Sequence, residues 1–165
     1  MTLKRLFRHL FIPDWVALRA FPKPLLDAIE QVIAASEARH SGELRFVVES
    51  GLDLPSLWRG TTARQRAAQL FGTLGVWDTE HNSGVLVYVQ LVDRKVEILA
   101  DRGIDARVGQ AQWDAICGRL QRRYAAGEFE AGSLDALAEI TGLLALHFPA
   151  KADNPNELPD RPVVL

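Results

Sequence analysis

The sequence predicts a single α/β domain built around a small mixed sheet. Apolar and β-branched runs predict three strands, at residues 43–49, 84–91 and 96–100. A helical pattern separates the first two strands, so we expect them to run parallel through a right-handed crossover. Only residues 92–95 separate the second strand from the third, and so short a link favours an antiparallel hairpin.

Length and composition indicate an ordinary globular protein. The chain has 165 residues, of which 48% are hydrophobic and 24% are charged. The 19 basic and 21 acidic residues give a net charge of −2, which argues against nucleic acid as the main partner. The single cysteine, Cys117, excludes an internal disulfide and a zinc site of clustered cysteines, and it fits a cytoplasmic location. No apolar run reaches the roughly 18 residues that a membrane-spanning helix needs.

Residues 1–21 predict a separate amphipathic segment. Leu3, Leu6 and Leu10 recur at helical spacing, with basic residues between them. The apolar stretch that follows ends at Pro13, which is too early for the core of a signal peptide, so we expect the segment to be retained. Two interpretations stay open: the helix packs on the domain or on a sister subunit, or it lies on an anionic membrane surface, peripheral to the inner membrane.

The main domain is expected at residues 22–148. Pro22 and Pro24 suit a first helical turn, and the helix that they open should end near Gly42. The strand at 43–49 follows, and a second helix should begin at a cap formed by Thr61 or Thr62.

The second half of the domain contains the strongest strand signal, at 84–91, which is β-branched, aromatic and almost uncharged. A third helix is predicted at 109–124. A fourth, capped by Ser133, should run to about His147. Residues 149–165 are rich in Pro, Asp and Asn, so we expect an extended C-terminal tail.

No short catalytic pattern of the P-loop, His-Glu-x-x-His or Gly-x-Ser-x-Gly type occurs. The predicted topology instead gathers polar residues at one edge of the sheet, where carboxylate and amide oxygens would suit calcium or magnesium. The candidate cation ligands are Asp78, Asn82, Asp101 and Asp105, with Glu43, His81 and Arg102 as additional site residues and Gly84 and Gly103 as backbone turns. The alternative is that these residues only cap turns and helices.

Several short motifs follow one another between residues 25 and 147. They are Ser83-Gly84-Val85-Leu86, Asp93-Arg94-Lys95, Asp101-Arg102-Gly103-Ile104-Asp105 and Gly127-Glu128-Phe129. In this order they resemble the TPM-domain family. The resemblance implies a three-layer α/β/α sandwich with helices on both faces of a small central sheet. It also implies calcium binding in some members, weak phosphatase activity in a plant thylakoid member, and assistance to membrane complexes in others.

The chain departs from the family pattern in two places. His81-Asn82-Ser83-Gly84 stands where the family has Asp-Asn-Gly, and Asp101-Arg102-Gly103 stands where it has Gly-x-Gly. Only Asn82, Gly84, Gly103 and Asp105 therefore carry over. Most bacterial members of that family have a signal peptide and a membrane anchor. Neither pattern is recognised in this sequence, so we expect it to resemble the short cytoplasmic branch of the family.

These observations predict a non-catalytic accessory or binding module that meets a protein partner, associates with a membrane protein complex and binds a divalent cation. The alternative is a weak metal-dependent phosphatase, in which Arg102 and Arg107 would hold the phosphate. A third alternative is a structural homo-oligomer that exchanges its N-terminal segment between subunits.

Overall fold

The computed structural model describes residues 3–11, 15–151 and 155–165. The remaining residues of the two predicted terminal segments, at 1–2, 12–14 and 152–154, lie outside the described part of the chain.

The centre of the fold is a four-stranded mixed sheet with the order β3-β2-β1-β4. Its strands are β1 (Glu43–Glu49), β2 (Gly84–Gln90), β3 (Lys95–Ala100) and β4 (Val163–Val164). β1 runs parallel to β2 and to β4, whereas β2 and β3 are antiparallel. The parallel crossover and the hairpin predicted from the sequence are therefore both confirmed.

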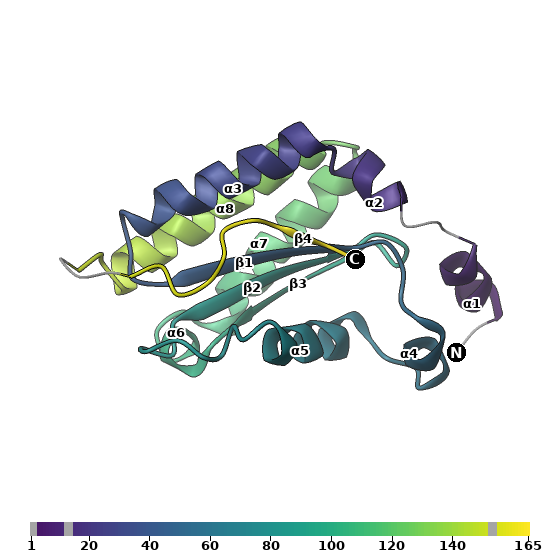
Figure 1. Ribbon diagram of the computed structural model, residues 1–165, viewed down its shortest axis with the longest axis horizontal. Coiled ribbons are helices and arrows are strands. Elements are labelled where there is room, and N and C mark those ends of the chain that lie inside the picture. Colours follow the sequence, from purple (N-terminus) through teal and green to yellow (C-terminus); the bar gives the residue numbers. More distant parts are fainter. Residues whose placement is uncertain (1–2, 12–14, 152–154) are drawn as a thin grey trace.

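The helices cover both faces of this sheet. They are α1 (Leu3–Leu10), α2 (Trp15–Ala20), α3 (Lys23–Glu37), α4 (Leu54–Trp58), α5 (Ala63–Thr73), α6 (Arg102–Asp105), α7 (Gln110–Ala125) and α8 (Phe129–His147). Figure 1 shows α3 and α8 on one side of the sheet and α5 on the other. The three-layer α/β/α sandwich is confirmed.

β2 is buried along its whole length because both of its faces pack against helices. Val85, Val87 and Val89 join the larger core with α3, α7 and α8. Leu86 and Tyr88 point the other way, into a smaller core with α5. This alternation follows from the two-residue period of a strand, and it explains why the sequence of β2 is apolar without a polar face.

The C-terminal tail packs on the domain. β4 adds to the free edge of β1, with Val163 opposite Val47 and Val164 opposite Val48. The Arg45 guanidinium donates hydrogen bonds to the carbonyls of Pro159 and Arg161. The sequence predicts only an extended tail here, because two valines give no strand signal by themselves.

Two predicted helix boundaries are wrong. α3 ends at Glu37 with Ala38 as its C-cap, before the predicted end near Gly42. α8 begins at Phe129 rather than after Ser133. Ser133 lies inside the helix, where its hydroxyl donates to the Phe129 carbonyl at 2.7 Å and lies 2.6 Å from the Tyr124 hydroxyl. A serine hydroxyl bonded one turn back is compatible with a helix interior, so the serine does not mark a cap here.

Candidate functional site

The edge predicted from the topology exists in the structure. Glu43 is the register partner of Gly84, and the Asp101 amide donates to the Gly84 carbonyl at 2.8 Å. The start of β1, the start of β2 and the end of β3 therefore meet at one edge of the sheet, as expected.

Two glycines let the loop before β2 close on this edge. A Cβ atom at Gly84 would lie 1.9 Å from the Val76 carbonyl oxygen, and one at Gly103 would lie 2.6 Å from the Asn82 carbonyl oxygen. The Gly103 amide donates to that same Asn82 oxygen at 3.1 Å. Asn82 has a positive φ of 51°, a conformation that asparagine adopts more readily than most residues. The loop thus lies directly on the first turn of α6.

Asp101 is one of two buried carboxylates at the edge, and Glu43 is the other. Asp101 Oδ1 caps α6 by accepting a hydrogen bond from the Arg102 amide at 2.6 Å. Its Oδ2 is buried and has no hydrogen-bond partner among the residues that the structure describes. The residue is only 7% exposed. A buried carboxylate oxygen without a donor is unusual in a folded protein, so this atom is the strongest sign of a ligand at the edge.

The other candidate side chains lie outside this buried spot. Asp78, Asn82, Arg102 and Asp105 are exposed. His81 Nε2 lies 2.6 Å from the Lys151 ammonium nitrogen. Within the described ranges, no three His, Cys, Asp or Glu side chains lie close enough to hold a metal ion. The edge therefore offers one buried carboxylate oxygen without a partner, on Asp101, and two loop carbonyls rather than a cage of carboxylates, and the cation site stays a prediction.

The Glu43 side chain binds the C-terminal tail. Its Oε2 accepts a hydrogen bond from the Leu158 amide at 3.1 Å, and burial raises the pKa of its carboxyl group. Arg107 is also engaged elsewhere: it donates to the His147 carbonyl at 2.7 Å and lies over the ring of Phe148. Both arginines considered for phosphate binding are exposed, but only Arg102 is adjacent to Asp101 in the chain and without these contacts.

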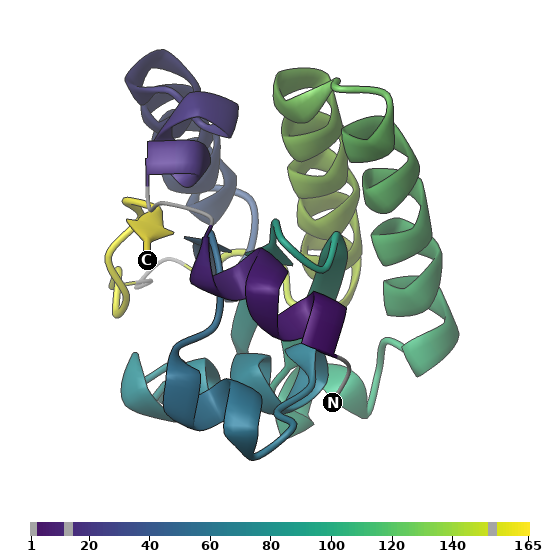
Figure 2. The same ribbon diagram turned by 90° about the vertical axis from the view of Figure 1, so that its right-hand side faces the viewer.

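The N-terminal helix docks through its basic face. The Arg5 guanidinium forms an ion pair of 2.7 Å with Asp93 in the turn between β2 and β3. Arg8 donates to the Val92 carbonyl. His9 is buried, accepts a hydrogen bond from the Leu52 amide at Nδ1 and places Nε2 3.2 Å from Asp93. Figure 2 shows α1 lying across this end of the molecule.

The apolar side chains at this end face solvent as a consequence. Phe11 is 71% exposed and Trp58 is 76% exposed. We name the whole set the N-terminal apolar face: Phe7, Leu10, Phe11, Trp15, Leu18, Leu54 and Trp58, each about half exposed or more. An apolar helical stripe normally marks a buried face, so the sequence pattern does not predict that the basic side of α1 turns inward. The acceptor-rich β2–β3 turn decides the orientation, and it is 80 residues or more away along the chain.

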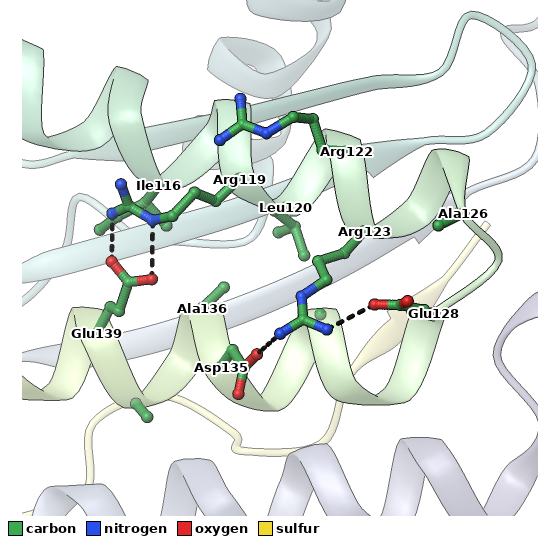
Figure 3. A pocket seen from close by; sticks show the side chains of 12 residues that line it. Ile116, Arg119, Leu120, Arg122, Arg123, Ala126, Glu128, Asp135, Ala136 and Glu139 are labelled. Carbon is green, nitrogen blue, oxygen red and sulfur yellow. Dashed lines mark hydrogen bonds and ion pairs between the residues drawn. The ribbon is translucent and has the colours of Figure 1, made fainter.

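A hollow of about 660 Å³ lies between α7 and α8. Figure 3 shows the guanidinium of Arg119 paired with Glu139, and that of Arg123 paired with Glu128 and Asp135. Arg122 points away from these carboxylates (Figure 3). Because the facing charges satisfy one another, we interpret this hollow as a salt-bridged seam between two helices.

The fold and the edge define the class of protein: a three-layer α/β/α sandwich in which the loop before β2 closes on the first turn of α6. A family model described as the TPM domain matches residues 22–143, so the chain belongs to the TPM-domain family.

Two solved structures are similar to this chain. The BA42 protein from the psychrophilic bacterium Bizionia argentinensis is 29% identical, with a TM-score of 0.74 over 85% of this chain and 92% of that chain. The N-terminal domain of a protein from P. gingivalis is 15% identical, with a TM-score of 0.62 over 81% of this chain and 88% of that chain, and it supports the fold alone. A comparison with curated proteins gives no match. None of the described helices is both long enough and apolar enough to span a bilayer.

Proposed function

We propose that the chain is a non-catalytic binding module that attaches peripherally to an anionic membrane surface through its N-terminal apolar face. The observation that carries this proposal is the orientation of α1, which is held by its basic side chains and presents Phe7, Leu10 and Phe11 to solvent. An interfacial helix needs this arrangement, because its apolar side must be free to enter the boundary between headgroups and acyl chains.

The distribution of charge favours an anionic membrane surface over an uncharged one. Residues 1–21 contain four basic residues and one acidic residue, whereas the other 144 residues contain 15 basic and 20 acidic ones. Arg19, Arg59 and Arg94 are exposed at or near the same end. A protein that is acidic elsewhere and basic at one end is oriented by an anionic surface.

The size of the apolar face supports binding without a spanning helix. Trp15 and Trp58 belong to the side-chain type that favours the boundary between water and lipid. Burial of a half-exposed large side chain contributes roughly 1 kcal/mol, so the seven side chains together would support reversible attachment.

Co-sedimentation of the full chain with vesicles tests this proposal. We expect recovery with phosphatidylcholine vesicles that contain phosphatidylglycerol, little recovery with phosphatidylcholine alone, and a loss of about tenfold or more in the Phe7→Ser, Phe11→Ser double variant. Leu146→Ser is the matched control, because Leu146 is 73% exposed on α8 and lies outside the N-terminal apolar face. Equal recovery of the double variant would overturn the proposal. The proposal would also be overturned if the wild-type chain did not sediment with vesicles but formed dimers, and the double variant formed none. The N-terminal apolar face would then bind a second copy of the chain instead of a membrane.

A second candidate function is the binding of a divalent cation at the sheet edge. The unpartnered Oδ2 of Asp101 favours it, because a hard cation would satisfy a buried carboxylate oxygen together with carbonyl oxygens of the loop. The carbonyls of His81 and Asn82 both lie close to Gly103, which follows Asp101 by two residues.

Titration with calcium and magnesium, followed by amide NMR, tests the cation site. We expect shifts in residues 79–83 and 101–105 that Asp101→Asn removes, because asparagine keeps the helix cap but loses the charge. Asp114→Asn on α7 is the control. An Asp101→Asn protein that titrates like the wild type would exclude the site. Hydrolysis of a phosphate monoester that needs the cation and is lost in Asp101→Asn would favour the phosphatase alternative instead.

A further inference from the structure

A second hollow of about 260 Å³ lies between α2, the turn that joins β2 to β3, and the corner between α7 and α8. Val16 and Ala20 of α2 form one wall, and Tyr124 and Phe129 form another. The Ala17 amide donates to the Ser50 hydroxyl at 3.1 Å, which fixes α2 against the sheet. The hollow is therefore bounded by elements that are held in place.

The lining of this hollow is apolar. The rings of Tyr124 and Phe129 lie 5.0 Å apart and both pack against Phe21. The Tyr124 hydroxyl is hydrogen-bonded to the Ser133 hydroxyl at 2.6 Å, and the side-chain amide of Gln121 donates to the Val96 carbonyl at 3.3 Å. Gln90 also lines the hollow, and its buried side-chain nitrogen Nε2 has no hydrogen-bond partner among the described residues. The space therefore combines a largely apolar lining with one unpaired donor, which suits an apolar chain that ends in an acceptor group.

Two cationic side chains also line this hollow. Arg94 and Lys95 are exposed, and neither side chain has a hydrogen bond or an ion pair with any residue in the described ranges. Arg94 has a positive φ of 54°, where glycine or asparagine would be the usual choice. A turn that places arginine in this conformation points to a use for its side chain.

We propose that this hollow binds the apolar chain of a small amphipathic carboxylate, a medium-chain fatty acid, with its carboxylate held by Arg94 and Lys95. The volume sets the size of the chain: a cavity of about 150 Å³ admits benzene, so 260 Å³ has room for one medium-length chain and not for two. Arginine and lysine at an apolar site complement a carboxylate because charge-assisted hydrogen bonds are stronger than neutral ones.

This inference goes beyond the proposed membrane attachment and does not depend on it. The fatty acid could come from solution or from a membrane, and the chemistry at the hollow is the same. Free decanoate, used below the concentration at which it forms micelles, tests the hollow without any vesicle.

Binding of decanoate to the full chain, measured by calorimetry and amide NMR, is the experiment. We expect shifts around Val96, Tyr124 and Phe129, and affinity at least about tenfold weaker for decanol, which lacks the charge. The Arg94→Gly, Lys95→Gln double variant should show the same tenfold loss, because it removes both cations and suits the turn. Ala20→Leu should remove binding by filling the hollow.

The controls separate this site from the N-terminal apolar face. Arg59→Gln removes an exposed cation outside the hollow and should leave decanoate affinity unchanged, as should Phe7→Ser, Phe11→Ser. Thermal unfolding of each variant shows that it is folded. Equal affinity for decanoate and decanol, equal affinity in a folded Ala20→Leu protein, or no binding by the wild type would each overturn the proposal.

Discussion

Arg5 and Asp93 are 88 residues apart in the chain and form a two-nitrogen ion pair, with Nη2 2.7 Å and Nε 3.0 Å from Asp93 Oδ2. The same Arg5 nitrogen Nη2 also donates to the Thr61 carbonyl at 3.1 Å. This relationship decides which side of α1 faces the solvent. The sequence pattern of α1 predicts a buried apolar side, but this ion pair holds the helix with its apolar side facing solvent.

Asp93→Asn should release α1. The amide keeps the shape of the carboxylate but loses the charge that pairs with Arg5 and His9, so we expect the free energy of opening of α1 to fall by about 1–3 kcal/mol. Hydrogen exchange of the amides of residues 7–11 measures this opening. Asp105→Asn, an exposed aspartate at the other edge of the sheet, is the control and should leave the exchange unchanged.

The same contact predicts a dependence on acid. Burial alone would raise the pKa of Asp93, but the hydrogen bonds from Arg5 and His9 outweigh it and hold the pKa below its usual value. A depressed carboxyl pKa stabilises the docked state above the unfolded pKa of about 4, and this contribution is lost as the pH falls through the lower, folded value. Docking of α1 should therefore be constant near neutral pH and weaken only in strong acid. Weakening between pH 8 and pH 6 would contradict this account.

Docking of the C-terminal tail should depend on pH near neutrality, unlike docking of α1. Burial raises the pKa of Glu37 to about 8, with further contributions from Asp160 in the tail and from Glu43 of β1. Arg45 is the cation that interacts with Asp160 at the same place. The docked state binds a proton that the released state loses above about pH 4.5, so docking of β4 should weaken from about pH 4.5 to pH 8 and then level off.

Glu37→Gln tests that dependence. Glutamine is neutral at every pH and can still donate to Asp160, so the slope between pH 5 and pH 8 should become smaller and the tail should be held more tightly at pH 8. The exchange rates of the Val164 and Leu165 amides report docking, and the Leu165 amide donates to the Val48 carbonyl at 2.9 Å. Glu30→Gln on α3 should keep the slope of the wild type.

Gly84→Ala should be strongly destabilising, and Gly142→Ala should not. A methyl group at Gly84 would meet the Val76 carbonyl oxygen at 1.9 Å, and that backbone cannot move without displacing the loop before β2. We expect a loss of about 2–4 kcal/mol in the free energy of unfolding, or no folded protein. Gly142 lies inside α8 with nothing within 4 Å of its Cβ position. Alanine at this position should therefore raise the free energy of unfolding by about 0.5–1 kcal/mol. Denaturant unfolding measures both.

Three of the four strands were predictable because β1, β2 and β3 each carry their own signal. β2 is apolar and β-branched on both faces, and the short link after it leaves an antiparallel hairpin as the natural connection. The meeting of Glu43 and Asp101 at one edge then follows from strand direction alone. β4 was not predictable, because its two residues become a strand only through the edge of β1 and the Arg45 contacts.

The candidate sites were less predictable because they depend on contacts between distant residues. The sequence names Asp101 as a candidate, but its buried, unpartnered Oδ2 appears only once the loop closes on Gly103. The outward face of α1 depends on Asp93, and the hollow beside Arg94 depends on the packing of α2 against the α7–α8 corner. Neither relationship leaves a periodic pattern in the sequence.

Membrane attachment through the N-terminal apolar face can be measured by tryptophan quenching with brominated lipid, because exposed tryptophans lie at both ends of the sheet: Trp15 and Trp58 at one end and Trp77 at the other. Trp58 belongs to the N-terminal apolar face, whereas Trp77, which is 56% exposed, lies in the loop that leads into the start of β2. Trp113 is buried and serves as a common background. One protein keeps Trp58 (Trp15→Phe, Trp77→Phe), and its matched control keeps Trp77 (Trp15→Phe, Trp58→Phe). We expect anionic vesicles with brominated acyl chains to quench the fluorescence of the first protein and not that of the second. Equal quenching of both proteins, or no quenching of Trp58, would overturn the proposed membrane attachment.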